Sequence, residues 1–192
     1  MFEFDSELFN LNQIADSGQC FRWQEIFCDN ESKKYHYQVP VKDKLLNIFQ
    51  DDKKIKIDCT ESEFESFWKN YFDFNTDYKK ITSLIVDDEY LQCAIKYGYG
   101  IRILNQDLWE MIISFIISQN NNIPRIKKSI EGLCKIFSKK QITSELKSFP
   151  TAQEIISFGD KNTILEKLKS VGLGYRDEYI YLISLYTIEN PT

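Results

Sequence analysis

The spacing of apolar residues changes once along the chain, and this change restricts the fold more than any other feature. Before about Thr60, apolar and polar residues alternate, as in "YHYQV" at residues 35–39. Such alternation is typical of strands with one buried face. After Thr60, apolar residues recur every three or four positions, as in "ESEFESFWKNYF" at residues 61–72, which is typical of amphipathic helices. The sequence therefore predicts an α+β protein, with an antiparallel sheet first and helices after it.

The first part of the chain contains three stretches that favour strands. They are "QCFRWQE" at residues 19–25, "YHYQV" at 35–39, and a hairpin in which "LLNIF" and "IKIDC" flank the polar turn "QDDKK" at 50–54. Thr60 and Glu63 then form a capping-box pattern that starts the first long helix. We expect residues 1–76 to form an antiparallel α+β domain.

Residues 77–192 are expected to form a helical domain, because paired caps and glycines divide them into helix-sized segments. The expected starts and ends are listed here: a helix at 87–98 ending at Gly98, starts at Asp107/Glu110, Thr151/Glu154 and Thr163/Glu166, ends at Gly159 and Gly172, and a last helix from Tyr175 through Tyr186. Ile180, Ile183 and Tyr186 are expected to form an exposed apolar face on that last helix.

Composition excludes several classes of protein. Five cysteines without a CxxC pair, together with one histidine, give a metal site no support, and we expect reduced thiols in a cytoplasmic protein. No apolar run is long enough for a membrane span, and no signal peptide is recognisable. Residues 1–100 carry 12 basic and 19 acidic side chains, and the remainder carry 12 and 10. The second part could face a phosphate backbone or could be an ordinary solvated surface.

The stretch "SFIISQNNNIPRIKK" places three asparagines, Asn120, Asn121 and Asn122, between two predicted helices. One asparagine is enough to cap the second helix, which has Pro124 in its first turn. The triplet is compatible with a polar loop that contains one cap. It is also compatible with a site for phosphate or base edges, because Arg125 and two lysines follow at the positive end of the helix dipole.

The stretch "VGLGYR" at residues 171–176 also has two interpretations. The glycines can form a helix C-cap at Gly172, after which a new helix begins. Alternatively, they allow close backbone approach, and Tyr175 and Arg176 then present an aromatic ring and a cation to a base stack. A dinucleotide fingerprint is not supported, because no strand precedes the stretch and a third glycine is missing.

Taken together, "SGQCFRW" at 17–23, "SFIISQNNNIPRI" at 114–126 and "VGLGYR" at 171–176 occur in the order and with the gaps found in the 8-oxoguanine DNA glycosylases. The chain resembles that family along its whole length. The resemblance implies an N-terminal twisted antiparallel sheet, similar to that of the TATA-binding protein, with a helix. An all-helical glycosylase domain would follow it.

The resemblance also implies a function in base-excision repair, with double-stranded DNA containing oxidised guanine as the partner and no cofactor. Family members flip the damaged base out of the duplex, excise it, and nick the strand as AP lyases. By the matching motifs, the Gly18 carbonyl would accept the N7–H of oxidised guanine, and Asn120 would fill the gap left by the base. Arg125 and Arg176 would reach the orphaned cytosine, and Tyr175 would wedge beside it. Asn121 and Asn122 would belong to the same DNA-binding loop.

The chain departs from the family pattern in one respect. The helix–hairpin–helix with its Leu-Pro-Gly-Val-Gly hairpin does not occur in it, and neither do the lysine nucleophile and aspartate that accompany that element. We therefore expect no catalytic residue here, an incomplete helical domain, and a possible partner fragment that carries the missing element. The alternatives are a non-catalytic module that binds damaged DNA and one half of a split protein. In a bacterium the protein would be nucleoid-associated.

Overall fold

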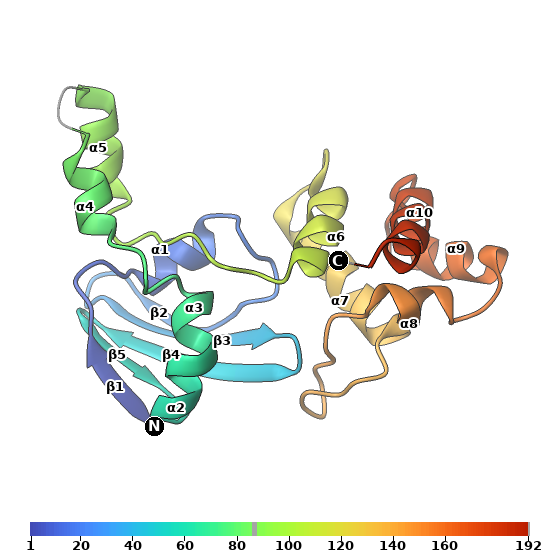
Figure 1. Ribbon diagram of the computed structural model, residues 1–192, viewed down its shortest axis with the longest axis horizontal. Coiled ribbons are helices and arrows are strands. Elements are labelled where there is room, and N and C mark those ends of the chain that lie inside the picture. Colours follow the sequence, from blue (N-terminus) through green and yellow to red (C-terminus); the bar gives the residue numbers. More distant parts are fainter. Residues whose placement is uncertain (86–87, 192) are drawn as a thin grey trace. The chain divides into compact units, whose positions relative to one another are not determined.

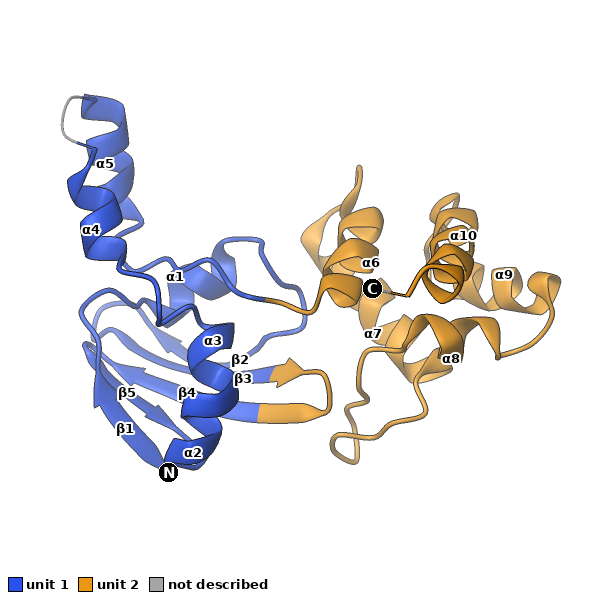
Figure 2. Ribbon diagram, viewed as in Figure 1, with its two compact units in different colours: residues 1–39, 46–105 blue, residues 40–45, 106–192 orange. Residues whose placement is uncertain are grey.

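The computed structural model describes residues 1–85 and 88–191, which form two compact units. Unit 1 contains residues 1–39 and 46–105, and unit 2 contains residues 40–45 and 106–192 (Figure 2). The sheet lies in the first part of the chain, and helices make up most of the second part (Figure 1). The α+β class predicted from the apolar spacing is therefore confirmed.

The sheet is antiparallel and five-stranded, with the order β1-β5-β4-β3-β2. Its strands are β1 Phe2–Asp5, β2 Gln24–Asp29, β3 Lys34–Val41, β4 Lys44–Asp51 and β5 Lys54–Ile57. The predicted hairpin is formed by β4 and β5, in which Ile48 pairs with Ile57 and Asp51 with Lys54. On β3, Tyr35, Tyr37 and Val39 are buried, as the alternation of "YHYQV" predicted.

The helices of unit 1 are α1 Leu11–Asp16, α2 Glu61–Glu63, the π-helical segment η1 Phe64–Trp68, α3 Lys69–Tyr71, α4 Tyr78–Ser83 and α5 Glu89–Tyr97. The predicted helix after Thr60 is present, and the Thr60 side chain accepts the Glu63 N–H. Figure 1 shows this helix, α2 to α3, across one face of the sheet. Asp87, the first residue of the helix expected at 87–98, lies outside the described residues.

The predicted strand at residues 19–25 is largely wrong. Residues 20–23 are irregular and β2 begins only at Gln24. Adjacent residues of a strand face opposite sides of the sheet, whereas Arg22 and Trp23 are both buried. Trp23 turns into the core, where its Nε1 donates to Tyr71 Oη at 3.0 Å.

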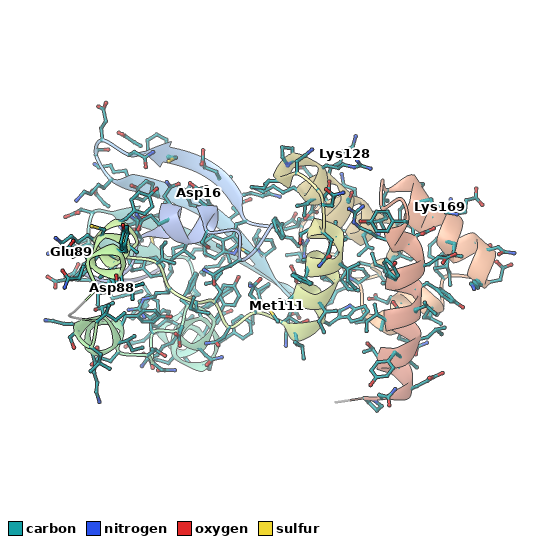
Figure 3. The ribbon with its side chains drawn as sticks, turned by 90° about the horizontal axis from the view of Figure 1, so that it is seen from above. Asp16, Asp88, Glu89, Met111, Lys128 and Lys169 are labelled. Carbon is teal, nitrogen blue, oxygen red and sulfur yellow. The ribbon has the colours of Figure 1, made fainter. Side chains whose placement is uncertain are left out.

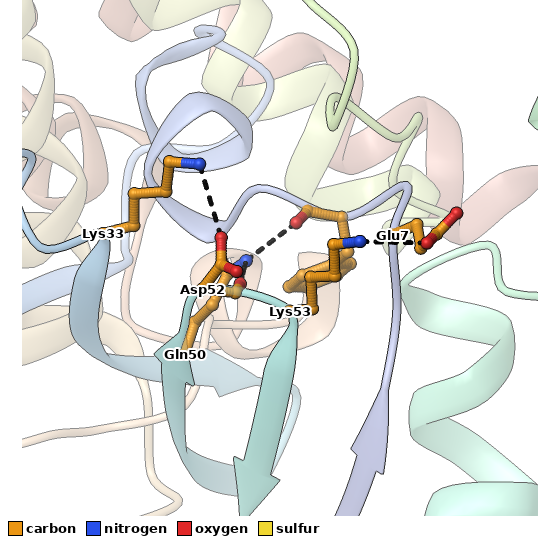
Figure 4. A network of polar contacts seen from close by, with 6 residues as sticks. Glu7, Lys33, Gln50, Asp52 and Lys53 are labelled. Atoms are coloured by element: carbon orange, nitrogen blue, oxygen red, sulfur yellow. Dashed lines mark hydrogen bonds and ion pairs between the residues drawn. The ribbon is translucent and has the colours of Figure 1, made fainter.

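Helix α1 was not expected from the sequence, and a buried glutamine fixes its start. Leu11 N donates to Gln50 Oε1 at 2.7 Å, and Gln50 Nε2 donates to Phe9 O at 2.8 Å and to Asp52 O at 2.7 Å. Ion pairs of Lys53 with Glu7 and of Lys33 with Asp52 surround this glutamine (Figure 4). The network matters for the site because α1 leads directly into the turn that contains Gly18.

Unit 2 consists mainly of α6 Leu108–Ser118, α7 Ile123–Phe137, α8 Ala152–Ile156, α9 Lys161–Ser170 and α10 Arg176–Glu189. The predicted caps at Asp107 and Thr151 are confirmed, and Thr151 with Glu154 forms a complete capping box. The core contains branched apolar residues of several helices, listed here: Ile113, Ile117, Ile130, Leu133, Ile155, Leu168 and Ile180. Among the described residues after 110, the only β-type pairing is an isolated bridge between Gln141 and Lys147.

Two expected boundaries differ from the structure. Helix α9 begins at Lys161, because the Asp160 carboxylate caps it by accepting the Thr163 N–H at 2.8 Å, so Thr163 is not the cap. Residues 77–105 group with the sheet in unit 1, although a domain boundary was expected after residue 76. Arg102 holds this segment there, since its side chain donates to Leu8 O at 2.8 Å and to Asp73 O at 2.7 Å.

The exposed face of α10 also differs from the expected one. Ile180 is fully buried, because α10 packs its other side on α6, α8 and α9. Ile183 is half-buried, and Tyr186 is exposed as expected. Tyr186 continues a row formed by Tyr175, Tyr179 and Leu182, and these four residues are 56–61% exposed and lie at helical spacing. We call these four residues the aromatic stripe. No helix in the described part of the chain combines the length and apolar character needed to cross a membrane.

Candidate nucleic-acid interface

Two junctions of unit 2 meet at one place, the loop between α6 and α7 and the turn between α9 and α10. Arg125 Nη2 in the first turn of α7 donates to Gly172 O at 3.3 Å. From the other side, the Arg176 guanidinium donates to the carbonyls of Gln119 and Asn120. The asparagine triplet and "VGLGYR", which lie about fifty residues apart in the sequence, therefore belong to the same surface.

The three asparagines have different tasks. Asn122 is the N-cap of α7, and its Oδ1 accepts the Arg125 N–H at 3.0 Å. Asn121 Nδ2 donates to Ile117 O at 3.0 Å and so caps the end of α6. Asn120 has left-handed backbone (φ 48°) and an exposed side chain. Within the described residues, the Asn120 amide has no hydrogen-bond partner, so it remains available to a ligand.

The turn "VGLGYR" forms the predicted helix C-cap, and of the predicted ring and cation only the Tyr175 ring is exposed. Gly172 (φ 84°) follows the end of α9 as a left-handed cap residue, and its N–H donates to Lys169 O at 3.0 Å. Gly174 (φ 59°) is also left-handed, with open space where a Cβ would lie. This second bend makes Tyr175 the residue before α10, with its ring 59% exposed. The turn thus ends one helix and also presents an aromatic ring to solvent.

Arg176 is positioned differently from the expected contact with an orphaned cytosine. It is 5% exposed, and its guanidinium donates to Leu173 O at 3.2 Å, to Asn120 O at 3.3 Å and to Gln119 O. It also stacks on Tyr175, with 4.5 Å between Cζ and the ring centroid. The carbonyls of Gln119 and Asn120 belong to the loop backbone, and no side-chain pattern in the sequence indicates that they accept these hydrogen bonds. In this conformation Arg176 fixes the Asn120 backbone by a hydrogen bond and packs against the buried side of the Tyr175 ring.

The surface around this junction is cationic. Arg125, Lys127 and Lys128 follow the asparagines, and all three side chains are exposed. Lys169, at the end of α9, is 66% exposed and lies 3.5 Å from the buried carboxylate of Asp177. Figure 3 shows Lys128 and Lys169 along the same edge of unit 2. Positive charge beside an exposed amide and an exposed aromatic ring is suited to a phosphate backbone with adjacent bases.

Gly18 lies in unit 1, in the exposed turn after α1. Its backbone is left-handed (φ 78°), and a Cβ at this position would meet no atom within 4 Å. Among the described residues no group donates a hydrogen bond to its carbonyl, so this acceptor is available. The structure describes Gly18 and the Asn120 junction in separate units.

The groups that could perform covalent chemistry are few. No lysine within residues 1–85 and 88–191 is buried, and Lys127, Lys128 and Lys169 are exposed. The five cysteines are unpaired, and burial raises the pKa of Cys59 to about 11. In the described part of the chain, no histidine, cysteine and carboxylate side chains gather as a metal site. The groups that the junction presents to solvent are the Asn120 amide, the Tyr175 ring and the surrounding cations.

Sequence comparison identifies relatives over most of the chain. Residues 1–112 match the family model described as 8-oxoguanine DNA glycosylase, N-terminal domain. The N-glycosylase/DNA lyase of Saccharomyces cerevisiae is 29% identical in an alignment 184 residues long, which covers 88% of this chain and 47% of the yeast protein. The chain thus spans about half the length of this curated relative.

Solved structures agree with the sequence comparison. MBOgg1 in complex with a low-affinity DNA ligand has a TM-score of 0.83 and 32% identity, covering 100% of this chain and 68% of that one. Clostridium acetobutylicum 8-oxoguanine glycosylase/lyase, in complex with double-stranded DNA containing cytosine opposite to 8-oxoG, has a TM-score of 0.83 and 28% identity. The match covers 100% of this chain and 67% of that one. The fold is that of the solved 8-oxoguanine glycosylases. The chain belongs to the 8-oxoguanine DNA glycosylase family.

Proposed function

We propose that the protein acts in base-excision repair by recognising oxidised guanine opposite cytosine in duplex DNA. The observation that carries this proposal is Asn120. Its two neighbours in the triplet cap α6 and α7, whereas its own amide is exposed and without a partner on a left-handed loop. Such an amide can hydrogen-bond in the space that a flipped base leaves. A loop needed only for capping would not require it.

The neighbouring residues have complementary tasks in this proposal. Tyr175 is the exposed aromatic wedge beside the gap, because inserting a ring replaces stacking lost when a base leaves the duplex. Arg125 reaches the orphaned cytosine, since its guanidinium is exposed and held only by one 3.3 Å bond to Gly172 O. Arg176 holds the loop and the wedge in place.

Gly18 discriminates oxidised guanine from guanine in this proposal. Oxidised guanine carries a hydrogen on N7 and guanine does not, so a carbonyl acceptor favours the damaged base. With guanine, the Gly18 carbonyl and the unprotonated N7 would be two buried acceptors facing each other, which costs about 1–3 kcal/mol. The available carbonyl of the exposed Gly18 turn supports this role, and the absence of a side chain lets a base approach closely.

Excision requires groups beyond those described. A lyase nucleophile is an unprotonated, desolvated amine held against the sugar C1′, and no lysine in the described residues is buried. We infer that a further segment with a helix–hairpin–helix, in the same or a separate chain, supplies the lysine and aspartate. The part of the aromatic stripe beyond Tyr175, which consists of Tyr179, Leu182 and Tyr186, supports this inference, because such a segment would cover it.

The second candidate function is a module that binds damaged DNA without excising the base. Among the described lysines of unit 2, all except the half-buried Lys44 and Lys147 are exposed, which favours this function over autonomous catalysis. In this case the Asn120 junction acts alone, and affinity depends mainly on phosphate contacts. Such affinity falls steeply with salt.

One experiment tests both the recognition of oxidised guanine and the need for a further segment. The protein is incubated with a duplex containing oxidised guanine opposite cytosine, with borohydride present to trap a Schiff base. We expect the 192-residue chain to bind this duplex in preference to one with guanine, and to give no trapped band alone. Asn120→Ala should abolish the preference, while Lys167→Gln on the exposed face of α9 is the control. A trapped band lost on mutating one lysine of this chain would overturn the need for a further segment. Equal affinity for both duplexes would overturn recognition itself.

A further inference from the structure

A groove of about 570 Å³ runs along α7, beside the turn between α9 and α10. Its charged lining consists of Arg125, Lys128 and Lys135 with one carboxylate, Glu131. We call it the α7 groove. Nothing in the described Asn120 junction requires Lys128 or Lys135, which lie farther along the helix. The groove therefore needs an explanation of its own.

Close packing of a helical glycine against the turn brings the two walls of the groove together. Gly132 lies in the interior of α7, where glycine costs about 1 kcal/mol relative to alanine. A Cβ on Gly132 would lie 2.9 Å from Val171 Cγ1, so only glycine allows this approach. On the facing wall, a Cβ on Gly172 would lie 3.5 Å from Ser129 Oγ of α7, an ordinary van der Waals contact. The walls are thus fixed by backbone geometry.

The cations of the groove are arranged in a row. Arg125, Lys128 and Lys135 fall on one side of α7 by helical spacing. The rise of an α-helix separates Lys128 from Lys135 by about 10 Å. One DNA strand presents a phosphate about every 3.4 Å along the duplex axis. Measured along the duplex axis, the distance between the two lysines therefore corresponds to about three phosphate-to-phosphate steps of one strand.

The two lysines share the groove with a single carboxylate of its lining, Glu131, and make no close ion pair with any described residue. Among the residues that the structure describes, neither Lys128 nor Lys135 has an ion-pair partner. Lys169 differs, because its ammonium lies 3.5 Å from Asp177 Oδ2. Two exposed ammonium groups that face one groove repel each other, and a polyanion would relieve this repulsion.

We propose that the α7 groove binds the phosphate backbone of the DNA strand opposite the lesion. The groove begins at Arg125, which the proposed function places at the orphaned cytosine, and it leads away from that base along α7. The inference rests on the proposed function and extends the footprint along one strand. It assigns Lys128 and Lys135 to phosphates, which carry no sequence information.

The test compares Lys128→Gln/Lys135→Gln with Lys139→Gln/Lys167→Gln, which removes two exposed lysines outside the groove. The probe is a duplex with an abasic-site analogue opposite cytosine, and its affinity is measured between about 50 and 200 mM salt. We expect the groove variant to lower the slope of log K against log salt by about 1.8, because each phosphate contact contributes about 0.9. The control pair should leave the slope unchanged.

A second probe identifies the strand. Neutral methylphosphonate linkages in the cytosine strand should weaken binding by the unmodified protein and have little effect on the groove variant. The same linkages in the damaged strand should weaken both proteins equally. An unchanged salt slope in the groove variant, while Asn120→Ala still loses lesion preference, would overturn the groove assignment and leave the proposed function standing.

Inorganic phosphate provides the remaining arm. If it bound the unmodified protein and not the groove variant, with equal DNA slopes for both, the groove would be a site for free phosphate and the DNA assignment would be wrong. If the unmodified protein bound no duplex at all, the proposed function would fail together with the groove. Circular dichroism melting verifies that the variants are folded.

Discussion

Arg176 shows how one residue can shape a binding surface without facing the ligand. Its guanidinium joins Leu173 O on one side to Asn120 O on the other, and Tyr175 lies on its face. The planar fork of arginine suits several carbonyls at once, whereas lysine offers a single point charge. Nε of Arg176 is buried without a partner, which adds a desolvation cost to this arrangement.

We expect Arg176→Lys to destabilise the protein by about 2–3 kcal/mol, because buried carbonyls lose donors that lysine cannot replace. Urea denaturation would measure the loss. Arg125→Lys is the matched control, because Arg125 is exposed and makes one 3.3 Å bond, and it should change the free energy of unfolding by about 0.5 kcal/mol or less. Equal effects of the two substitutions would show that the Arg176 contacts contribute little.

At the scale of elements, the sequence predicted those features that depend on local chemistry. The caps at Asp107, Thr151 and Asn122 follow from side chains that bond their own helix. At α9, Asp160 and Thr163 compete as caps three residues apart, and periodicity does not decide between them. The burial of Arg22 beside Trp23 depends on contacts with distant segments, so alternation there was misleading.

The candidate site follows the same division. The motifs and their residue types indicated Asn120, Tyr175 and the surrounding cations. That Asn121 and Asn122 are caps, and that only the Asn120 amide is left without a partner, depends on the backbone path between α6 and α7. The burial of Arg176 depends on the Gln119 and Leu173 carbonyls. Every residue has a backbone carbonyl, so the sequence does not indicate which ones will accept hydrogen bonds.

The capping box of α8 gives a prediction about pH. Burial raises the pKa of Glu154, but hydrogen bonds from Thr151 N (2.8 Å) and Lys139 N (2.9 Å) outweigh it and hold the pKa below its ordinary value. A lowered folded pKa means that the stabilisation is present above the unfolded pKa of about 4.3. It is lost as pH falls through the folded value.

We therefore expect Glu154→Gln to be less stable than the unmodified protein by about 0.5–1 kcal/mol at neutral pH, a value reduced by solvent screening. The difference should shrink below about pH 4.3, where the carboxylate becomes protonated. Denaturation curves across this range would measure it. A difference that grew on acidification would contradict the sign of the pKa shift.

At the scale of the whole molecule, exposed apolar area is concentrated on particular helices. On α10 the aromatic stripe runs from Tyr175 through Leu182 to Tyr186. On α6, Leu108, Met111 and Phe115 are 56%, 44% and 64% exposed at helical spacing. Surface leucines that occur singly are ordinary, but rows along helices mark a contact surface. Both rows belong to unit 2, whose helices α6 and α10 pack on each other.

We expect the chain, when studied alone, to self-associate through the aromatic stripe as concentration rises. Burying one leucine contributes about 1.5–3 kcal/mol, and 1.4 kcal/mol corresponds to about tenfold in affinity. Leu182→Glu/Tyr186→Glu should therefore weaken association at least about tenfold in sedimentation equilibrium. The matched control is Leu91→Glu/Tyr97→Glu, which places the same charges on exposed residues of α5 in unit 1. If the control weakened association equally, general charge repulsion would be the cause. A monomer at all concentrations would show that the stripe is compatible with water, and the inferred segment would then lack its docking surface.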